Sequence, residues 1–380
     1  MNGGRMTSLG SGLLLVIGGC AATPGPIFAP IEPPLVWPPP PAPARIRYLG
    51  QLTSAEDLRP VRSPLVPLGE LFVGREPPQP LYGPRDVLVT RGGERVWVAD
   101  PGGRCVHLFD LEHRKYAQLR RMAETQLLSP VGLCAGPEGS VYVCDSEAVA
   151  IHQLDADTGA WMATLKLPEE LQRPADMMFN EVTSELYVMD VSGHDLKVLA
   201  PDGTLRRIIG QRGRESGEFN FPSSITRDGE MMWVVDTGNN RIQGLTLDGE
   251  PLRSFGQAGD ATGDLAFPKS LAIDSDGHLY VVDARFENVQ IFDRDGRLLL
   301  VFGQEGSGPG EFWLPGGIEI DARDRIWICD AYNRRLQVFE YLKGPDAGAP
   351  ENGTTREQPL PRAPAALPPI PATQPVKEAI

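Results

Sequence analysis

The sequence predicts an all-β fold, a six-bladed β-propeller whose blades each contain four antiparallel strands. Three observations predict it: a unit that recurs six times, a fixed order of residue types in the unit, and turn residues between its apolar runs. Each unit begins at a proline, passes through an apolar stretch and a turn, and ends in an aromatic-centred apolar run followed by aspartate. Consecutive aspartates are 45, 45, 46, 47 and 47 residues apart. A period in the forties with strand-like content is typical of propeller blades.

The fifth unit shows its four strands most clearly. Apolar runs at residues 270–273, 279–282, 288–293 and 298–302 are separated by turn sequences rich in aspartate and glycine. Glycine adopts positive φ without strain and aspartate hydrogen-bonds to its own backbone, so these turns favour hairpins. The same order in the other units predicts four strands in each.

One aspartate recurs in every unit, three residues after the central aromatic side chain. The six are Asp100, Asp145, Asp190, Asp236, Asp283 and Asp330. A group that is repeated in every blade serves something that every blade needs, so we interpret these residues as structural rather than catalytic. Their carboxylates are expected to hold the loop between the second and third strands through backbone amides, with Arg241 and Arg335 as partners in the fourth and sixth units.

The sixth unit ends after its third strand, at about residue 339, so another segment must complete it. Residues 70–74 read like the outer strand of a unit, and we expect this N-terminal strand to close the ring. Residues 45–49 are also strand-like and compete for the role. Closure would remove the open sheet edges that invite aggregation.

The N-terminal sequence predicts export. Arg5 precedes a short apolar run at residues 9–17, which is too short to span a bilayer, and Ile17-Gly18-Gly19-Cys20 follows. Small residues before a cysteine resemble the lipobox of bacterial lipoproteins, so residues 1–20 are interpreted as a lipoprotein signal peptide and Cys20 as the lipidated residue. The alternative is an ordinary secretory signal cleaved near Ala22.

Composition divides the remaining chain into three parts. Residues 21–44 are rich in proline and are expected to form an extended tether, residues 45–343 the propeller, and residues 344–380 a disordered tail rich in proline and alanine. The four cysteines outside the signal, Cys105, Cys134, Cys144 and Cys329, are expected to be small buried residues.

The charge balance argues against nucleic acid as a partner. The chain has 50 Asp and Glu residues against 36 Lys and Arg residues, a formal net charge of -14. Phosphate backbones are bound by basic surfaces.

Two units carry a more specific pattern, Asp236-Thr-Gly-Asn-Asn-Arg-Ile-Gln243 and Asp330-Ala-Tyr-Asn-Arg-Arg-Leu-Gln337. They resemble NHL repeats, in which aspartate and two further residues precede Asn-His-Arg-Ile-Gln. The histidine of that pattern is replaced by Asn240 and Arg334. The resemblance covers about 270 residues and implies the propeller fold, but it does not imply one activity, because this fold hosts enzymes and binding modules alike.

Enzymes with this fold gather unlike residues at the mouth of the central channel. The peptidylamidoglycolate lyase relatives carry zinc on histidines there, whereas the positions after the six prolines of this chain hold none. Gluconolactonase-like propellers bind calcium through Glu, Asn and Asp. Asp86 and Asp176 could contribute to such a site, or they could be solvated or paired with Arg85 and Lys269. No cofactor is predicted, and calcium is kept as an alternative.

The loops at the channel mouth carry aromatic and arginine side chains, which are common anchors of protein interfaces. Tyr82, Arg212, Phe286 and Tyr332 are the candidate interface residues. We therefore expect a lipid-anchored protein of the bacterial cell envelope, most simply at the outer membrane, that binds or scaffolds an envelope protein or complex through this face. The alternative is a metal-dependent lyase or lactone hydrolase with its site at the channel mouth.

Overall fold

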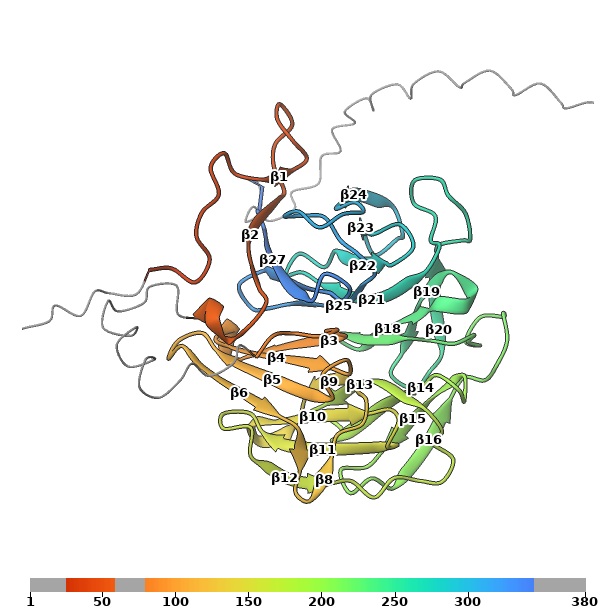
Figure 1. Ribbon diagram of the computed structural model, residues 1–380. Coiled ribbons are helices and arrows are strands. Elements are labelled where there is room, and N and C mark those ends of the chain that lie inside the picture. The colour runs from red at the N-terminus through yellow and green to blue at the C-terminus, as the bar shows by residue number, and fades with distance from the viewer. Residues whose placement is uncertain (1–24, 59–78, 345–380) are drawn as a thin grey trace, which may run out of the picture. The chain divides into compact units, whose positions relative to one another are not determined.

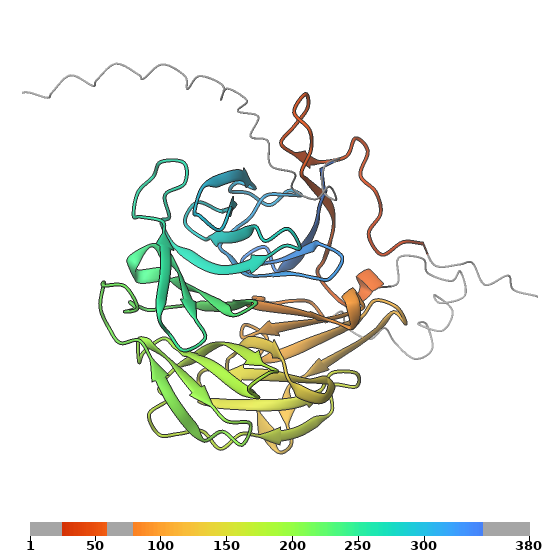
Figure 2. The ribbon, with the colours of Figure 1, turned by 180° about the vertical axis from the view of Figure 1, so that it is seen from behind.

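The computed structural model describes residues 25–58 and 79–344, which form six principal sheets around a central channel (Figures 1 and 2). Five of these sheets have four antiparallel strands and the sixth has five. The first strand of every repeat lies innermost, and each of these six strands contacts the first strands of the two neighbouring blades. The all-β, six-bladed propeller predicted from the sequence is confirmed.

Blades one to three follow one another along the chain. Blade one consists of β3 (Asp86–Thr90), β4 (Arg95–Asp100), β5 (Cys105–Asp110) and β6 (Lys115–Leu119). Blade two consists of β9 (Pro130–Ala135), β10 (Ser140–Asp145), β11 (Ala150–Asp155) and β12 (Trp161–Thr164). Blade three consists of β13 (Pro174–Asn180), β14 (Glu185–Asp190), β15 (Asp195–Leu199) and β16 (Leu205–Ile209). A two-stranded hairpin, β7 (Arg121–Met122) and β8 (Thr125–Gln126), joins the first two blades.

Blades four and five repeat this order, and blade six departs from it. Blade four consists of β17 (Ser224–Asp228), β18 (Met231–Asp236), β19 (Arg241–Thr246) and β20 (Pro251–Phe255). Blade five consists of β21 (Pro268–Ile273), β22 (Leu279–Asp283), β23 (Asn288–Phe292) and β24 (Leu298–Phe302). Blade six consists of β25 (Pro315–Ile320), β26 (Arg325–Asp330), β27 (Arg335–Tyr341), β2 (Ile46–Leu52) and β1 (Val36–Trp37). The helices are single 3-10 turns: η1 (Ala55–Leu58), η2 (Arg91–Gly93), η3 (Pro137–Gly139) and η4 (Thr237–Asn239).

The turn between the second and third strands has the same backbone conformation in every blade. The fourth residue after each repeat aspartate is left-handed, with φ between 47° at Val149 and 56° at His194. These residues are not glycines, so the conformation is intrinsically unfavourable. Hydrogen bonds that the aspartate accepts from backbone N–H groups of the same turn compensate for it; Gly103 N–H, for example, donates to Asp100 at 2.8 Å.

The fourth strand of blade six comes from the N-terminal part of the chain. Strand β2 pairs with β27 along its length, with an irregularity near Leu49 (Figure 1). Its side chains Ile46, Tyr48 and Leu52 are buried in the core. The alternative prediction, in which the strand at residues 45–49 closes the ring, therefore agrees with the structure. The predicted closing strand at residues 70–74 lies outside the described residues, and β2 already occupies its place.

Residues 25–44 differ from the extended tether that their prolines predict. Trp37 lies in β1 with its ring centroid 5.8 Å from those of Phe302 and Phe339, and Phe28 packs edge-on against Trp327 at 6.0 Å. Arg114 donates hydrogen bonds to the carbonyl oxygens of residues 25 and 58. The reason is that large apolar side chains stand between the prolines, and burying them against the last blade stabilises a packed segment more than an extended one.

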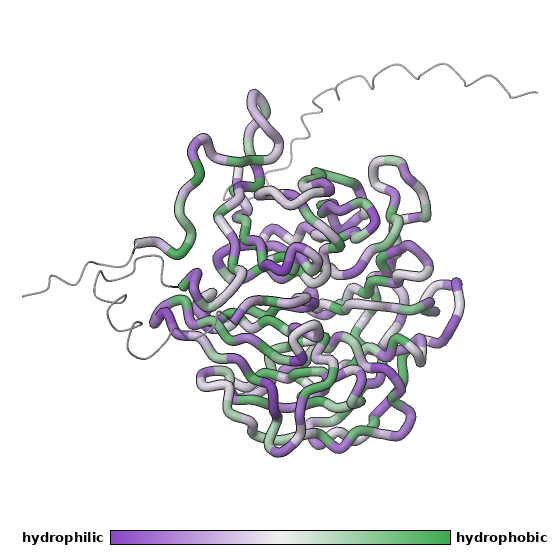
Figure 3. The backbone as a smooth tube through the Cα atoms, viewed as in Figure 1, coloured by the Kyte–Doolittle hydropathy of each residue, from purple (hydrophilic) through white to green (hydrophobic). Residues whose placement is uncertain are grey.

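Six apolar clusters fill the spaces between and within the blades, each built around fully buried side chains such as Trp97, Trp233 and Trp327. Apolar and polar stretches of the chain are intermixed within the blades (Figure 3), and the second strands are buried apolar runs such as that of β18. Within the described residues, none of the helices has the length and apolar character that crossing a membrane requires.

Candidate functional site

The repeat aspartates accept hydrogen bonds from backbone N–H groups at the end of the channel where the six repeat prolines lie. Asp100 accepts the N–H groups of Tyr82 and Gly83, which precede the first inner strand, as well as that of Gly103 in its own turn. The other blades repeat this arrangement, with donors at Leu128, Ser129, Ala148, Gln172, Arg173, Gly193, Asn220, Ala266, Phe267 and Trp313. All six carboxylates are fully buried.

Blades four and six add an arginine to this network. Arg241 Nε lies 2.8 Å from Asp236, and its other nitrogens donate to carbonyl oxygens of residues 214, 215 and 218. Arg335 makes the equivalent contacts with Asp330, at 2.7 Å, and with residues 307, 308 and 311. Each arginine thereby fixes the long loop that leads into its blade, which is a structural task.

Blade one replaces arginine and glutamine of this network by Cys105 and His107. Together with Asp100 they place three possible metal-binding atoms within 4.8 Å of one another. Each of them has protein partners, however: His107 contacts Asp100 at 3.1 Å and the Tyr116 hydroxyl at 2.7 Å, and Cys105 lies 3.3 Å from His107. The histidine makes the contact that Gln243 and Gln337 make in their blades. We interpret this cluster as a variant of the repeat network.

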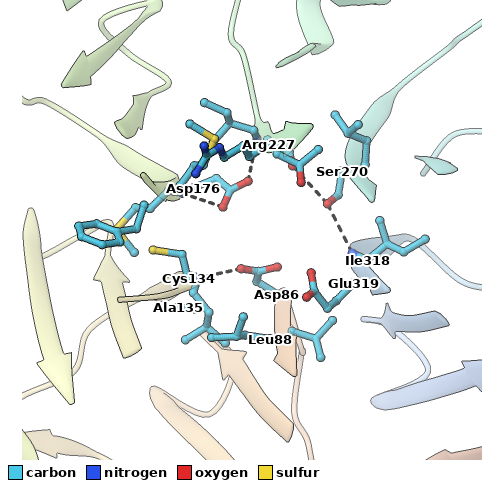
Figure 4. Close-up of a pocket in the computed structure, with 18 residues that line it drawn as sticks. Asp86, Leu88, Cys134, Ala135, Asp176, Arg227, Ser270, Ile318 and Glu319 are labelled. Carbon is cyan, nitrogen blue, oxygen red and sulfur yellow. Dashed lines mark hydrogen bonds between the residues drawn. The ribbon is translucent and has the colours of Figure 1, made fainter. Parts of the chain in front are cut away.

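The central channel holds a cavity of about 220 Å³ lined by all six inner strands. Three acidic side chains, Asp86, Asp176 and Glu319, point into the same space (Figure 4). They come from β3, β13 and β25 of blades one, three and six. The structure thus brings together the two carboxylates that the sequence singled out and adds a third.

Two of these carboxylates connect neighbouring blades. Asp86 accepts the N–H of Leu133 in blade two at 2.8 Å, and Asp176 accepts the N–H of Ile225 in blade four at 2.9 Å. Among the described residues, neither carboxylate forms a direct ion pair with Arg85 or Lys269, but the charge of Arg85 is among the effects that oppose the raised pKa of both acids. The register of β9 is irregular at its start, which leaves N–H groups there that need acceptors, and Asp86 supplies one for Leu133.

Burial makes these acids difficult to ionise. Burial, and then the neighbouring Asp176 carboxylate, raise the pKa of Asp86 to about 8. Burial also raises the pKa of Asp176, although hydrogen bonds from Ile225 and Met177 oppose the shift. The pKa of Glu319 rises to about 8, mainly through burial and next through Asp86. Carboxyl groups in this state either hold protons or bind a cation that neutralises them, and carboxylate oxygens are the ligands that Ca²⁺ prefers.

Glu319 was not predicted from the sequence, because it stands between two isoleucines near the end of an inner strand. A signal was available in the repeat. The fourth residue after the proline is apolar or uncharged in the other five blades, where it is Leu88, Cys134, Met178, Thr226 and Ala272. A lone glutamate at that position is the feature that could have indicated it.

Three basic side chains lie at the upper rim of the channel. Arg85 and Lys269 directly follow the prolines of blades one and five, and Arg173 precedes the proline of blade three. Burial, and then the charges of Arg85 and Arg173, lower the pKa of Lys269 to about 8, so the three cations act on one another across the mouth.

The face of the ring that carries the six prolines is formed by the segments leading into the inner strands and by the loops between second and third strands; we call it the mouth face. Seven exposed large apolar side chains lie on it: Tyr82, Leu128, Phe221, Phe267, Trp313, Leu314 and Tyr332. Among the described residues, the loops of the opposite face carry one, Val182, and the others are Ile31 and five on the outer strands: Trp161, Met162, Ile208, Leu252 and Leu299. Six of the seven stand one or two residues before a repeat proline, and of these six the sequence had indicated Tyr82 as an interface candidate.

The four candidate interface residues fall into two groups. Tyr82, Arg212 and Tyr332 are exposed, and the Tyr332 ring lies 5.5 Å from that of Trp313. Phe286 is partly buried and offers less surface. Cys20 lies outside the described residues, and the other four cysteines are buried and unpaired.

A histidine in the loop between the second and third strands of blade three hydrogen-bonds to a segment of the mouth face. His194 occupies the place of the histidine in the NHL pattern, and its Nδ1 accepts the Phe221 N–H at 3.0 Å. Asn240 and Glu287 occupy the same place in the next two blades and bind the segments before the following prolines.

Comparison with known proteins agrees with this geometry. Residues 119–311 match the family described as the Teneurin NHL domain, which is more than half of the chain. The chain belongs to the NHL-repeat propellers. The resemblance seen at residues 236–243 and 330–337 is thereby confirmed, and NHL propellers are protein-interaction modules.

This NHL propeller is also similar to individual proteins. It is 34% identical over 158 residues to the human E3 ubiquitin-protein ligase NHLRC1, covering 39% of this chain and 38% of that protein. Among solved structures, virginiamycin B lyase from Staphylococcus aureus is 16% identical with a TM-score of 0.51, covering 69% of this chain and 96% of that one. A calcium-binding regucalcin from Agrobacterium tumefaciens is 16% identical with a TM-score of 0.50, covering 68% and 90%. The two structures show the shared fold alone.

Proposed function

We propose that this NHL propeller is a lipid-anchored protein of the bacterial cell envelope that binds another envelope protein through its mouth face. The observation that carries the proposal is the uneven distribution of exposed apolar side chains: seven large ones lie on the mouth face and one on the loops of the opposite face, among the residues described. Exposed apolar surface that gathers on one face favours protein contact, and aromatic residues are common interface anchors.

The position of these side chains supports the same role. Phe221, Phe267 and Leu314 directly precede prolines, and their backbones are held by His194, Asp283 and Glu287. Side chains on a backbone that is already fixed lose less conformational freedom when a partner binds. The mouth face therefore offers apolar anchors on a rigid support.

Pull-down from solubilised envelope tests this role, with one double variant on the mouth face and one elsewhere. Trp313→Ser with Tyr332→Ser should reduce the recovery of the specific partner several-fold. Leu252→Ser with Leu299→Ser, on the exposed outer strands β20 and β24, should not. Equal recovery with both double variants would contradict the proposal, provided that both proteins keep the melting temperature of the wild type.

The anchor rests on the sequence Ile17-Gly18-Gly19-Cys20. We infer export, cleavage before Cys20 and lipid attachment to its thiol, with the outer membrane as the destination because Ala21 and Ala22 follow. Mass spectrometry of the N-terminal peptide and membrane fractionation test the inference. Cys20→Ser should abolish the lipid mass and release the protein from the membrane fraction; an unlipidated wild type cleaved near Ala22 would contradict it.

A second role is favoured by Glu319, which joins Asp86 and Asp176 in the channel. Three carboxylates around one cavity could bind a hard cation such as Ca²⁺, which would serve a metal-dependent lyase or lactone hydrolase. Elemental analysis of the purified protein tests this role. Stoichiometric calcium that disappears in Asp86→Asn and in Glu319→Gln would support it, and calcium retained by both variants would place the ion elsewhere.

A further inference from the structure

The rim of the channel on the mouth face carries three positive charges from alternate blades. Arg85 belongs to blade one, Arg173 to blade three and Lys269 to blade five. The corresponding positions of the three blades between them hold uncharged residues: Ser129 and Val131, Phe221 and Ser223, and Leu314 and Gly316. The charges thus surround the mouth rather than cluster on one side of it.

None of these three side chains forms a direct ion pair among the described residues, although the charge of Arg85 acts on Asp86 and Asp176 in the channel. Within residues 25–58 and 79–344, no carboxylate lies within ion-pair distance of Arg85, Arg173 or Lys269, and their charged groups donate no hydrogen bond to the protein. The more deeply buried cations behave differently, since Lys197 and Arg335 each contact aspartates within 3 Å. Arg85 and Lys269 are partly buried, whereas Arg173 is exposed. Desolvated cations are normally paired, so the two partly buried charges without an ion-pair partner favour an anion supplied from outside.

The channel acids attract Arg85 but do not hydrogen-bond to it, because their oxygens are directed elsewhere. The Asp86 carboxylate is directed to the N–H of Leu133, and that of Asp176 to the N–H groups of Met177 and Ile225. Arg85 instead extends toward blade six, because a Cβ placed on Gly316 would lie 3.5 Å from its Nη1. The guanidinium therefore lies toward blade six, and its charge acts on Lys269.

Contacts on both its backbone and its ammonium group fix the position of Lys269. Its carbonyl oxygen accepts a hydrogen bond from the Ser223 hydroxyl at 2.7 Å, and its ammonium nitrogen lies 3.8 Å from the centroid of the exposed Phe267 ring. A cation on a fixed backbone and beside an aromatic face is partly desolvated, which strengthens its attraction to an anion.

We propose that Arg85, Arg173 and Lys269 together bind a carboxylate of the protein partner that docks on the mouth face. The inference rests on the proposed function and adds the chemistry of the contact: an acidic side chain or a C-terminal carboxylate enters the channel mouth while apolar groups cover the surrounding aromatic side chains. A nucleic acid is a poor occupant, because its many phosphates would meet a chain of net charge -14.

Citrate is a suitable probe because it presents three carboxylates to three cations. The readout is acylation of lysines at about pH 8, near the pKa of Lys269, followed by peptide mass spectrometry. Millimolar citrate should slow the modification of Lys269 several-fold and leave the exposed Lys166 unchanged. Arg85→Gln and Arg173→Gln should each weaken the protection, whereas Arg206→Gln on the exposed strand β16 should not.

Three results would overturn the proposal. Citrate could leave Lys269 unprotected, it could protect Lys269 equally in Arg85→Gln and Arg173→Gln, or inorganic phosphate could protect where citrate does not. Recovery of the partner in the pull-down is independent of this measurement. Absent protection with intact partner recovery would therefore reject the carboxylate contact alone, and protection with no partner recovery would reject the docking role alone.

Discussion

The ammonium nitrogen of Lys269 lies 3.8 Å from the centre of the Phe267 ring, two residues away on the same segment. This contact joins the two features that distinguish the mouth face, its exposed apolar side chains and its basic rim. Both stand beside the proline that begins an inner strand, so the scaffold that closes the propeller also sets their positions.

The repeat network is expected to carry much of the stability of blade six. Asp330→Ala would remove the acceptor for Trp313 N–H and leave the buried guanidinium of Arg335 without its carboxylate. Breaking a buried pair in this way costs about 3–5 kcal/mol in the free energy of unfolding. Urea denaturation measures it, with the exposed Glu181→Ala as the control. A loss no larger than that of the control would contradict the structural role of the aspartate.

The closing strand β2 should contribute as much to the free energy of unfolding as the strands of the repeats. Leu52 is fully buried and packs in the cluster around Trp327 and Leu336. Leu52→Ala should lower the free energy of unfolding by about 2–5 kcal/mol, the usual cost of a large-to-small change in a core. Leu299→Ala, on the outer strand β24 and half exposed, is the matched control. Equal stability of the two variants would indicate that the ring is closed by another segment.

The acids of the channel predict a dependence of stability on pH. The pKa of Glu319 is raised from 4.5 to about 8 in the folded protein, so the native state retains a proton that the unfolded state releases. The stability that this group contributes is complete below pH 4.5 and is lost as the pH rises toward 8. Glu319→Gln removes the effect and should become more stable relative to the wild type over this range, by roughly 1 kcal/mol per pH unit at most.

Melting temperatures of the two proteins at pH values below 5 and near 8 measure this difference. The chelator-treated protein is used, because a bound cation would stabilise the ionised acids. A constant difference between variant and wild type across the range would mean that Glu319 is not buried as described.

The proposed cation site in the channel predicts that calcium changes the melting temperature. If the three carboxylates bind Ca²⁺, millimolar calcium at pH near 8 should raise the melting temperature of the wild type, because a ligand that binds only the folded state stabilises it. Asp86→Asn keeps an acceptor for Leu133 N–H but loses the charge, so it should lose most of the calcium response. A similar response in the wild type and in Asp86→Asn, or none in either, would contradict a cation site in the channel.

Much of the fold could be predicted because the same residue pattern occurs in six consecutive units. The spacing of the aspartates located the blades, and the turns after residues 273 and 293 located strands to within two residues. The closing strand was harder to assign, because it belongs to no repeat and must be chosen among several short apolar segments. Residues 36–37 were missed for a related reason: prolines around Trp37 suggested an extended chain, while its packing against Phe302 and Phe339 depends on residues far away in sequence.

The candidate site was less predictable. Asp86 and Asp176 were identified from their place after the prolines, but their true partners are backbone N–H groups of neighbouring blades, which no sequence pattern marks. The position of Arg173 at the rim could not be predicted from the sequence either. It stands before a proline rather than after one, and only the ring geometry brings it to the rim with Arg85 and Lys269.

Site-specific photo-crosslinking in the native envelope tests the central claim most directly. A photoreactive residue is placed at Trp313 or at Phe267 on the mouth face, and at Val182 on the opposite face, which is the most exposed large apolar position of the described chain. We predict that the two mouth-face positions give the same protein adduct, that Val182 does not, and that the adduct at Trp313 diminishes when Arg85 and Lys269 are changed to Gln and Met. The same adduct from Val182 and from Trp313, or none from the mouth face while Val182 gives one, would contradict the account.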